Sequence, residues 1–353
     1  MELTEQIHRA PKVALHDHLD GGLRPSTVID LAEQAGVGLA STDPDTLARW
    51  FFDQADSGSL AQYLTTFDVT VAVMQTEAAL KRVATEFVLD QAADGVVYAE
   101  ARWAPVQHIR GGLSLEDTVR AVRDGLAEGM AQARAQGQVI VARQLLSELR
   151  GFTPTTDVAE LAIAYRDDSV AGMDCAGPEL GFSSAAFAAS YDMARRANLL
   201  ITIHAGEVDG LESINEALHD CGAHRLGHGV RLIDDIDMTG PVPRLGHLAA
   251  YVATLRIPLE LAPTSNLQTG VAEDLAHHPF DQLYRAGIRV TVNCDNRLMS
   301  DTSLTQEFSR LAQTFGYTMG DIRRFTLNAA KSAFLDWESK RGLIHDLILP
   351  GYE

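Results

Sequence analysis

Cysteine, lysine and long hydrophobic stretches are all scarce in this sequence. The 353 residues include three cysteines and four lysines. No run of about 18 apolar residues, the length that a membrane-spanning helix needs, occurs in the chain. A small, odd number of cysteines excludes a disulfide framework and is typical of reduced thiols in the cytoplasm. We therefore expect a cytoplasmic protein that does not cross a membrane.

Positive charge is also in deficit. The chain has 29 Lys and Arg against 48 Asp and Glu, which gives a formal net charge of −19. Nucleic-acid binding requires a basic surface that displaces counterions from phosphates, so no nucleic-acid partner is expected. The N-terminus has acidic residues where a signal peptide has basic ones, and no export is expected either. The sequence leaves the oligomeric state open.

What the sequence does have is the composition of a globular protein, with 46% hydrophobic and 22% charged residues. No linker, fixed-period repeat or break in composition divides it, which predicts a single domain over residues 1–353. Short apolar runs, each followed by a polar cluster, alternate with helical patterns. The eight predicted strands span residues 12–18, 95–102, 139–146, 170–174, 199–204, 225–228, 257–261 and 289–295. This alternation predicts a (β/α)8 TIM barrel, in which catalytic groups gather at the carboxyl ends of the strands.

The segment 41–91 is too long for one strand-to-strand crossover. Leu60, Tyr63, Leu64 and Phe67 recur at helical spacing within it. We expect a helical insertion after the first strand that caps the mouth of the barrel.

Two histidines end the first predicted strand. Side chains alternate along a strand, so His16 and His18 point to the same side and can chelate one metal ion, although two surface histidines at this spacing are also common. His204 ends the fifth strand and Asp295 ends the eighth. Separately, His204 also fits a core histidine, and Asp295 also fits a helix N-cap.

Together these residues supply three imidazole nitrogens and one carboxylate, a ligand set that suits a catalytic zinc with room for a water molecule. A second ion is not expected, because no lysine lies at the end of the fourth strand, where binuclear barrel hydrolases place a carboxylated one. Gly227 and Gly229 flank His228 at the end of the sixth strand. His228 is a candidate general base or electrostatic anchor, with a structural role as the alternative.

The motifs resemble those of the adenosine deaminase family of metal-dependent aminohydrolases, in the same order over almost the whole chain. They are LHDHLDG at 15–21, YAEAR at 98–102, GMDCAGPE at 172–179, HAGE at 204–207, GHG at 227–229, PTSN at 263–266 and NCDN at 293–296. The resemblance implies one zinc ion per chain, and its ligands would be His16, His18, His204 and Asp295.

The resemblance also implies roles around a purine nucleoside. Glu207 would protonate purine N1, and His228 would orient and help to deprotonate the attacking water, from which Asp295 would accept a hydrogen bond. The backbone N–H of Gly177 would meet N3, while Asp20, with His18 nearby, would bind the ribose hydroxyls.

Four positions depart from the family pattern. Asn296 stands where many members have aspartate beside purine N7, and its amide donates a hydrogen bond without taking up a proton. Cys175 and Cys294 flank strand-end residues, and we expect them to pack as small apolar groups instead of binding metal. Tyr63 replaces a more usual phenylalanine, and either a hydroxyl near the ribose or an ordinary helix face explains it.

The resemblance predicts hydrolytic deamination of adenosine, and of 2′-deoxyadenosine, to inosine and ammonia. Another 6-aminopurine, such as adenine or an aminofutalosine-type nucleoside, is the alternative; Asp20 favours a ribosyl substrate, because adenine-specific relatives tend to have glutamate there. A non-catalytic nucleoside-binding barrel is disfavoured because no expected catalytic residue is lost. The net negative charge predicts that AMP is a poor substrate.

Overall fold

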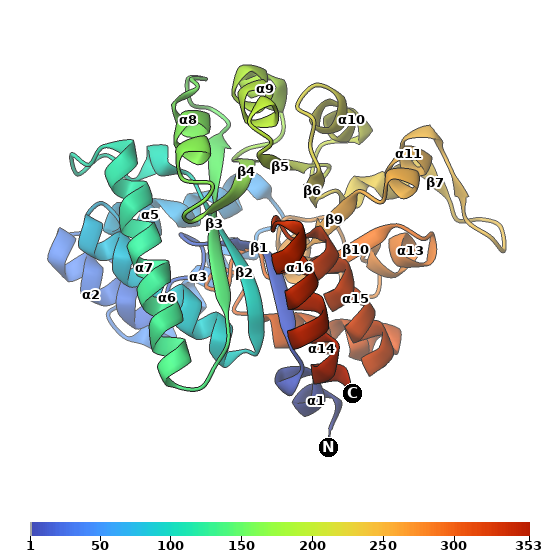
Figure 1. The fold of residues 1–353 in the computed structure, drawn as a ribbon, viewed down its shortest axis with the longest axis horizontal. Coiled ribbons are helices and arrows are strands. Elements are labelled where there is room, and N and C mark those ends of the chain that lie inside the picture. The colour runs from blue at the N-terminus through green and yellow to red at the C-terminus, as the bar shows by residue number, and fades with distance from the viewer. Residues whose placement is uncertain (1) are drawn as a thin grey trace.

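The computed structural model describes residues 2–353, which form an eight-stranded parallel barrel surrounded by helices (Figure 1). The strand order is β1-β2-β3-β4-β5-β6-β9-β10. Their bounds are β1 Lys12–His18, β2 Val96–Trp103, β3 Val141–Leu149, β4 Val170–Ala176, β5 Leu200–Ala205, β6 Arg225–His228, β9 Pro258–Leu261 and β10 Arg289–Val292. A bridge between Asp17 and Asp295 joins the first strand to the segment after the last. The predicted TIM barrel and its eight strands are confirmed.

Sixteen α-helices lie within the described residues, most of them on the outside of the barrel. They are α1 Leu3–Arg9, α2 Pro25–Ala35, α3 Pro44–Ala55, α4 Leu60–Tyr63, α5 Phe67–Val73, α6 Glu77–Ala93, α7 Leu115–Ala135, α8 Asp157–Ala164, α9 Ala188–Arg196, α10 Leu211–His219, α11 His247–Leu255, α12 Pro263–Gln268, α13 Phe280–Arg285, α14 Leu304–Phe315, α15 Met319–Ser332 and α16 Trp337–Gly342. In Figure 1 both ends of the chain lie at the lower edge, beside α1.

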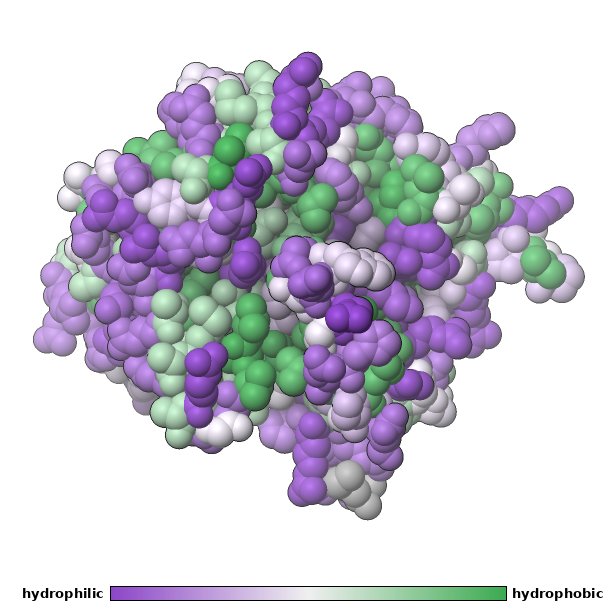
Figure 2. Space-filling view, viewed as in Figure 1, coloured by the Kyte–Doolittle hydropathy of each residue, from purple (hydrophilic) through white to green (hydrophobic). Residues whose placement is uncertain are grey.

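The apolar residues of the strands and of the inner helix faces form one large core. All seven residues of β1 and of β4 are buried, as the parallel strands of a helix-covered sheet require. Hydrophilic residues interrupt the hydrophobic areas across the face shown in Figure 2. No helix among residues 2–353 is long and apolar enough to cross a membrane.

The helical insertion is confirmed, but its predicted extent is wrong. α3, α4 and α5 form the insertion, and Tyr63, Leu64 and Phe67 line the cavity at the barrel mouth. In contrast, α6 packs along α7 and against β2, and is therefore the ordinary crossover helix of the barrel wall. Helices of the insertion and helices around the barrel show the same periodicity, so the sequence could not distinguish α6 from the insertion.

A short antiparallel pair, β7 Ile236–Asp237 with β8 Arg244–Leu245, was not predicted. Two residues per strand are too few to show an alternating pattern. An ion pair of 2.6 Å between Arg244 and Asp237 holds the pair together.

Candidate metal centre and active site

The four residues expected to bind metal converge at the carboxyl ends of the strands. His16 and His18 end β1, His204 lies near the end of β5, and Asp295 follows β10. His16 Nε2 and His18 Nε2 lie 3.1 and 3.3 Å from Asp295 Oδ1. His18 Nε2 also lies 3.2 Å from His204 Nε2. The four groups therefore surround one point, although the chain places nearly 280 residues between the first and the last.

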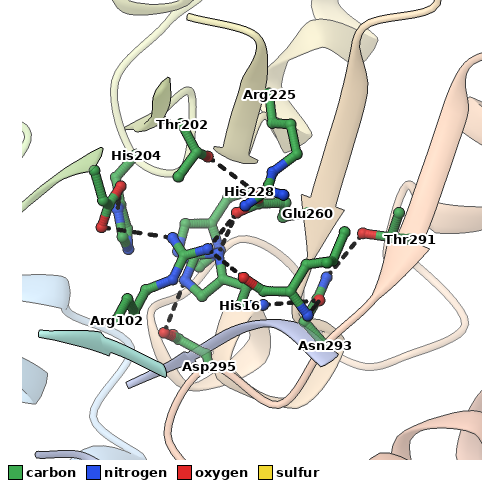
Figure 3. A network of polar contacts seen from close by, with 12 residues as sticks. His16, Arg102, Thr202, His204, Arg225, His228, Glu260, Thr291, Asn293 and Asp295 are labelled. Atoms are coloured by element: carbon green, nitrogen blue, oxygen red, sulfur yellow. Dashed lines mark hydrogen bonds and ion pairs between the residues drawn. The ribbon is translucent and has the colours of Figure 1, made fainter. Parts of the chain in front are cut away.

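Two buried carboxylates orient the rings of His16 and His204 through their Nδ1 atoms. Glu260 on β9 lies 3.1 Å from His16 Nδ1 (Figure 3). Asp174 on β4 lies 3.1 Å from His204 Nδ1. A carboxylate accepts the Nδ1 proton of a neutral imidazole, which leaves the Nε2 lone pair free to bind a metal. The arrangement is that of metal-bound histidines with carboxylate partners.

This donor set fits a bound cation. With their Nδ1 protons donated to carboxylates, His16 and His204 direct unprotonated Nε2 atoms toward each other and toward the Asp295 carboxylate. Burial holds the pKa of His18 well below its ordinary value, so this ring is also neutral. Lone pairs and a carboxylate at such short distances repel one another unless a positive ion lies among them. We conclude that the residues present can hold one metal ion.

Asp295 is held in place by backbone and side-chain contacts. Its backbone N–H donates to His16 O at 3.0 Å, and its carbonyl accepts from His18 N–H at 2.7 Å. Ser265 Oγ donates to Asp295 Oδ2 at 2.6 Å. The residue has φ 62°, a left-handed conformation that is uncommon for a side chain larger than glycine and is maintained by these contacts.

Glu207 lies just beyond β5 and is almost completely buried. Burial, and after it the charge of Asp295, raise the pKa of Glu207 to about 8, so this carboxyl is largely protonated at neutral pH. Thr269 Oγ1 lies 2.8 Å from its Oε1. Glu207 is therefore a hydrogen-bond donor facing the cavity, and it can act as a general acid.

The turn that carries Glu207 is held by another carboxylate. Glu179 accepts the backbone N–H groups of four consecutive residues, 206–209, at 2.5 to 3.1 Å. It also accepts from Ser213 Oγ at 2.7 Å. The end of the GMDCAGPE motif thus builds the loop that follows the HAGE motif.

A chain of hydrogen bonds sets the proton on His228. Phe280 N–H donates to His278 Nδ1 at 3.1 Å, so His278 carries its proton on Nε2, which lies 3.3 Å from Asn266 Oδ1. The other end of the Asn266 amide, Nδ2, lies 3.0 Å from His228 Nδ1. A neutral His228 therefore has its proton on Nε2, which lies 3.6 Å from Glu207 Oε2.

This tautomer bears on two assignments. His228 also comes near the metal centre, since His16, His204, His228 and Asp295 offer ligand atoms within 4.8 Å of one another. A protonated Nε2 cannot bind a metal, which favours His18 as the third imidazole ligand. Burial lowers the pKa of His228 to about 4, so the ring is neutral and presents an N–H donor to the site.

The residues expected to contact substrate line two adjoining cavities. The inner cavity contains Glu207, His228, Asp295 and Asn296, and the outer one contains Asp20. His18, Leu64, Phe67, Ala176 and Gly177 line both. The structure thus brings every predicted site residue except His16 to these two adjoining cavities, and His16 lies buried in the metal cluster beside them.

Gly177 and Asn296 occupy positions that depend on close packing. Gly177 has φ +93°, and an added Cβ would lie 3.2 Å from Arg150 O, so a side chain is disfavoured there on two grounds. Asn296 Nδ2 donates to Tyr63 Oη at 2.8 Å. The Tyr63 hydroxyl therefore supports the residue expected at purine N7, a role that the sequence did not indicate.

The buried thiols take no part in the metal cluster. Cys175 and Cys294 belong to the hydrophobic core, and burial raises the pKa of both. All three cysteines are free. Their predicted packing role is confirmed.

Several residues around the site were not predicted to act there: Glu260, Asp174, Glu179, Asn266 and His278. The sequence could have indicated a role for Glu260, because a charged residue is unusual inside a predicted buried strand. Asn266 and Glu179 lay in quoted motifs without a role. Nothing in the local sequence distinguishes His278 from a surface histidine.

Comparison with known proteins identifies the family. The family model described as adenosine deaminase matches residues 11–349. A protein named adenosine deaminase from Mycobacteroides abscessus is 53% identical, over 98% of this chain and 96% of its own. Adenosine deaminase 1 from Streptomyces coelicolor is 52% identical, over 99% and 88%.

Among solved structures, the Arabidopsis protein ADAL in complex with IMP superposes with a TM-score of 0.82 at 26% identity, covering 99% of this chain and all of its own. The family is metal-dependent, in agreement with the His and Asp cluster described above. The family match over nearly the full length and the close relatives agree with the barrel and its site, and the chain belongs to the adenosine deaminase family.

Proposed function

We propose that this protein catalyses the hydrolytic deamination of adenosine, and of 2′-deoxyadenosine, to inosine and ammonia, as a single 353-residue catalytic domain with one zinc ion. Relatives at about half identity that bear the name adenosine deaminase support the reaction. The observation that carries the proposal is the convergence of His16, His18, His204 and Asp295 beside the buried carboxyl of Glu207. Three free, buried thiols also support a cytoplasmic location.

Zinc would be held by four groups: Nε2 of His16, His18 and His204, and the carboxylate of Asp295. Imidazole and carboxylate side chains are the ligands of catalytic zinc sites. Bound there, zinc would lower the pKa of water and make hydroxide available near neutral pH.

The purine ring would lie in the inner cavity. Glu207 donates its proton to N1, which draws electrons from C6 and makes this carbon electrophilic. The N–H of Gly177 and the amide of Asn296 donate to N3 and N7, so three sides of the base are read by hydrogen bonds. The orientation directs the exocyclic amino group toward the metal centre.

Water then adds to C6. The Nε2–H of His228 donates to the attacking oxygen and orients it, because its hydrogen-bond chain leaves no free acceptor on that ring. Asp295 accepts the proton that the water gives up. The C6–N bond breaks and the proton held by Asp295 leaves with the amino group as ammonia. The C6 hydroxyl loses its proton, which leaves the 6-oxopurine and replaces the proton that Glu207 gave to N1.

The ribose would lie in the outer cavity, next to Asp20. One oxygen of this buried carboxylate, Oδ1, has no hydrogen-bond partner, and a sugar hydroxyl can donate to it. Adenine lacks any group that reaches Asp20, so this contact separates the nucleoside from the free base. We infer that adenine is a poorer substrate; an aminofutalosine keeps the sugar hydroxyls, so the assay below must separate it from adenosine.

An ultraviolet assay of the purified enzyme tests the proposal. Adenosine and 2′-deoxyadenosine should be deaminated, and adenine and an aminofutalosine should not. A chelator should abolish the activity, and one equivalent of zinc should restore it. Turnover of adenine alone, or equal activity without metal, would refute the proposal.

A further inference from the structure

The outer cavity continues beyond the position of the sugar. It has a volume of about 220 Å³ and adjoins the inner cavity through five shared residues. Asp20 lines the outer cavity only, as do Gln107, Ser147 and Phe152. Its Oδ1 lies 4.0 Å from Nδ1 of His18, which lines both cavities, so Asp20 lies near their junction. Phe152 is 45% exposed, so the chamber opens to solvent beside an aromatic ring.

The pose of the nucleoside determines which part of the substrate faces the outer cavity, and this inference therefore rests on the proposed function. With N1 at Glu207 and N3 at Gly177, the glycosidic bond points from the inner to the outer cavity. The ribose then lies between His18 and Asp20. The part of the cavity beyond Asp20 is left for whatever the 5′ carbon carries.

Most of the groups that line the outer part are apolar. Leu64, Phe67, Ala104, Leu149, Phe152 and Pro178 form the larger share of its surface. A neutral, apolar 5′ substituent would remove this surface from water, which favours binding.

The outer cavity offers a 5′-phosphate one cation and one carboxylate. Arg150 is the one cation among the described residues that line this cavity. One of its nitrogens donates to His204 O at 2.6 Å, whereas its Nε and Nη1 are buried without a hydrogen-bond partner. The unpartnered carboxylate oxygen of Asp20 lies in the cavity and repels an anion.

We propose that the outer cavity is a subsite for neutral apolar groups on the 5′ carbon, so that the enzyme deaminates 5′-deoxy-5′-alkylthioadenosines. The reaction is unchanged: water adds at C6, ammonia leaves, and the thioether stays intact. The Arabidopsis ADAL structure, which has the same fold, is a complex with IMP, a ligand that carries a 5′-phosphate.

The test compares substrates that differ only at the 5′ carbon. The zinc-loaded enzyme is assayed with adenosine, 5′-deoxyadenosine, 5′-deoxy-5′-methylthioadenosine and AMP. The methylthio compound should exceed 5′-deoxyadenosine in kcat/KM by about three- to tenfold, since both lack the hydroxyl and only one fills the cavity. AMP should fall at least about a hundredfold below adenosine.

The substitution F152A should remove most of the advantage of the methylthio group and leave adenosine turnover near that of the parent. Trp337 is 78% exposed and lines neither cavity, so W337A is a matched control that should keep the advantage. Two results would refute the proposed subsite while adenosine is still deaminated. One is a methylthio compound whose kcat/KM is no higher than that of 5′-deoxyadenosine, and the other is AMP turned over as well as adenosine. Loss of adenosine activity in the parent would instead refute the proposed function.

Discussion

The buried carboxylate of Glu260 gives a sharp test of how the barrel supports the metal centre. It is fully buried and lies 2.6 Å from Arg102, 2.5 Å from Arg225 Nε and 3.1 Å from His16 Nδ1. Burial opposes its ionisation, but the two arginines hold its pKa well below the usual range. Figure 3 shows it among these three side chains.

The substitution Glu260→Gln removes the charge and keeps the shape. Two effects should follow. Breaking a buried ion pair leaves an uncompensated charge and costs about 3–5 kcal/mol of unfolding free energy. Replacing the carboxylate that accepts from His16 Nδ1 by a neutral amide should weaken metal binding by about 10–100-fold, the usual effect of altering the partner of a metal-bound histidine.

The two effects are measured separately. Urea unfolding of the metal-free protein gives the stability, and competition with a chromophoric chelator gives the metal affinity. Glu100→Gln is a matched control, because Glu100 is buried and lies 2.5 Å from the same Arg225 without an observed contact to His16. The control should lose stability and keep metal affinity. Unchanged metal affinity in Glu260→Gln would show that our account of the histidine support is wrong.

Three further substitutions test the catalytic groups. Glu207→Gln should lower kcat at least about a hundredfold with full metal content, and parent activity should decline as the pH rises through about 8, where this carboxyl ionises; a flat profile between pH 6 and 9 would contradict this. His228→Gln should retain more activity than His228→Ala, since an amide N–H can replace a donor but not a base; equal losses would favour the base role. Asn296→Asp should keep activity only with an acid-shifted pH profile, because aspartate must be protonated to donate to N7, and an unshifted profile would refute the donor argument.

The barrel could be predicted because its strands leave a local pattern. Each is a short apolar run that ends in a polar cluster, and β1 begins and ends where the sequence indicates. The carboxyl ends of parallel strands meet at one face, so the positions of His16, His18, His204 and Asp295 in their strands were enough to bring them together. The helices were less certain, as α6 shows, because amphipathic periodicity does not reveal which surface a helix covers.

The proton positions could not be predicted in the same way. The tautomer of His228 depends on Asn266, His278 and a backbone N–H at Phe280, which come from a strand-end helix and the loop after it. No spacing rule connects these residues, since the contacts exist only in the folded chain. The sequence alone did not decide whether His228 is a general base or an electrostatic anchor. The resemblance implied that it helps to deprotonate the attacking water. The hydrogen-bond chain favours an Nε2 donor on His228, and our proposal therefore gives the role of proton acceptor to Asp295. The identity of the residues could thus be inferred from sequence, whereas the direction in which each gives or takes a proton required the structure.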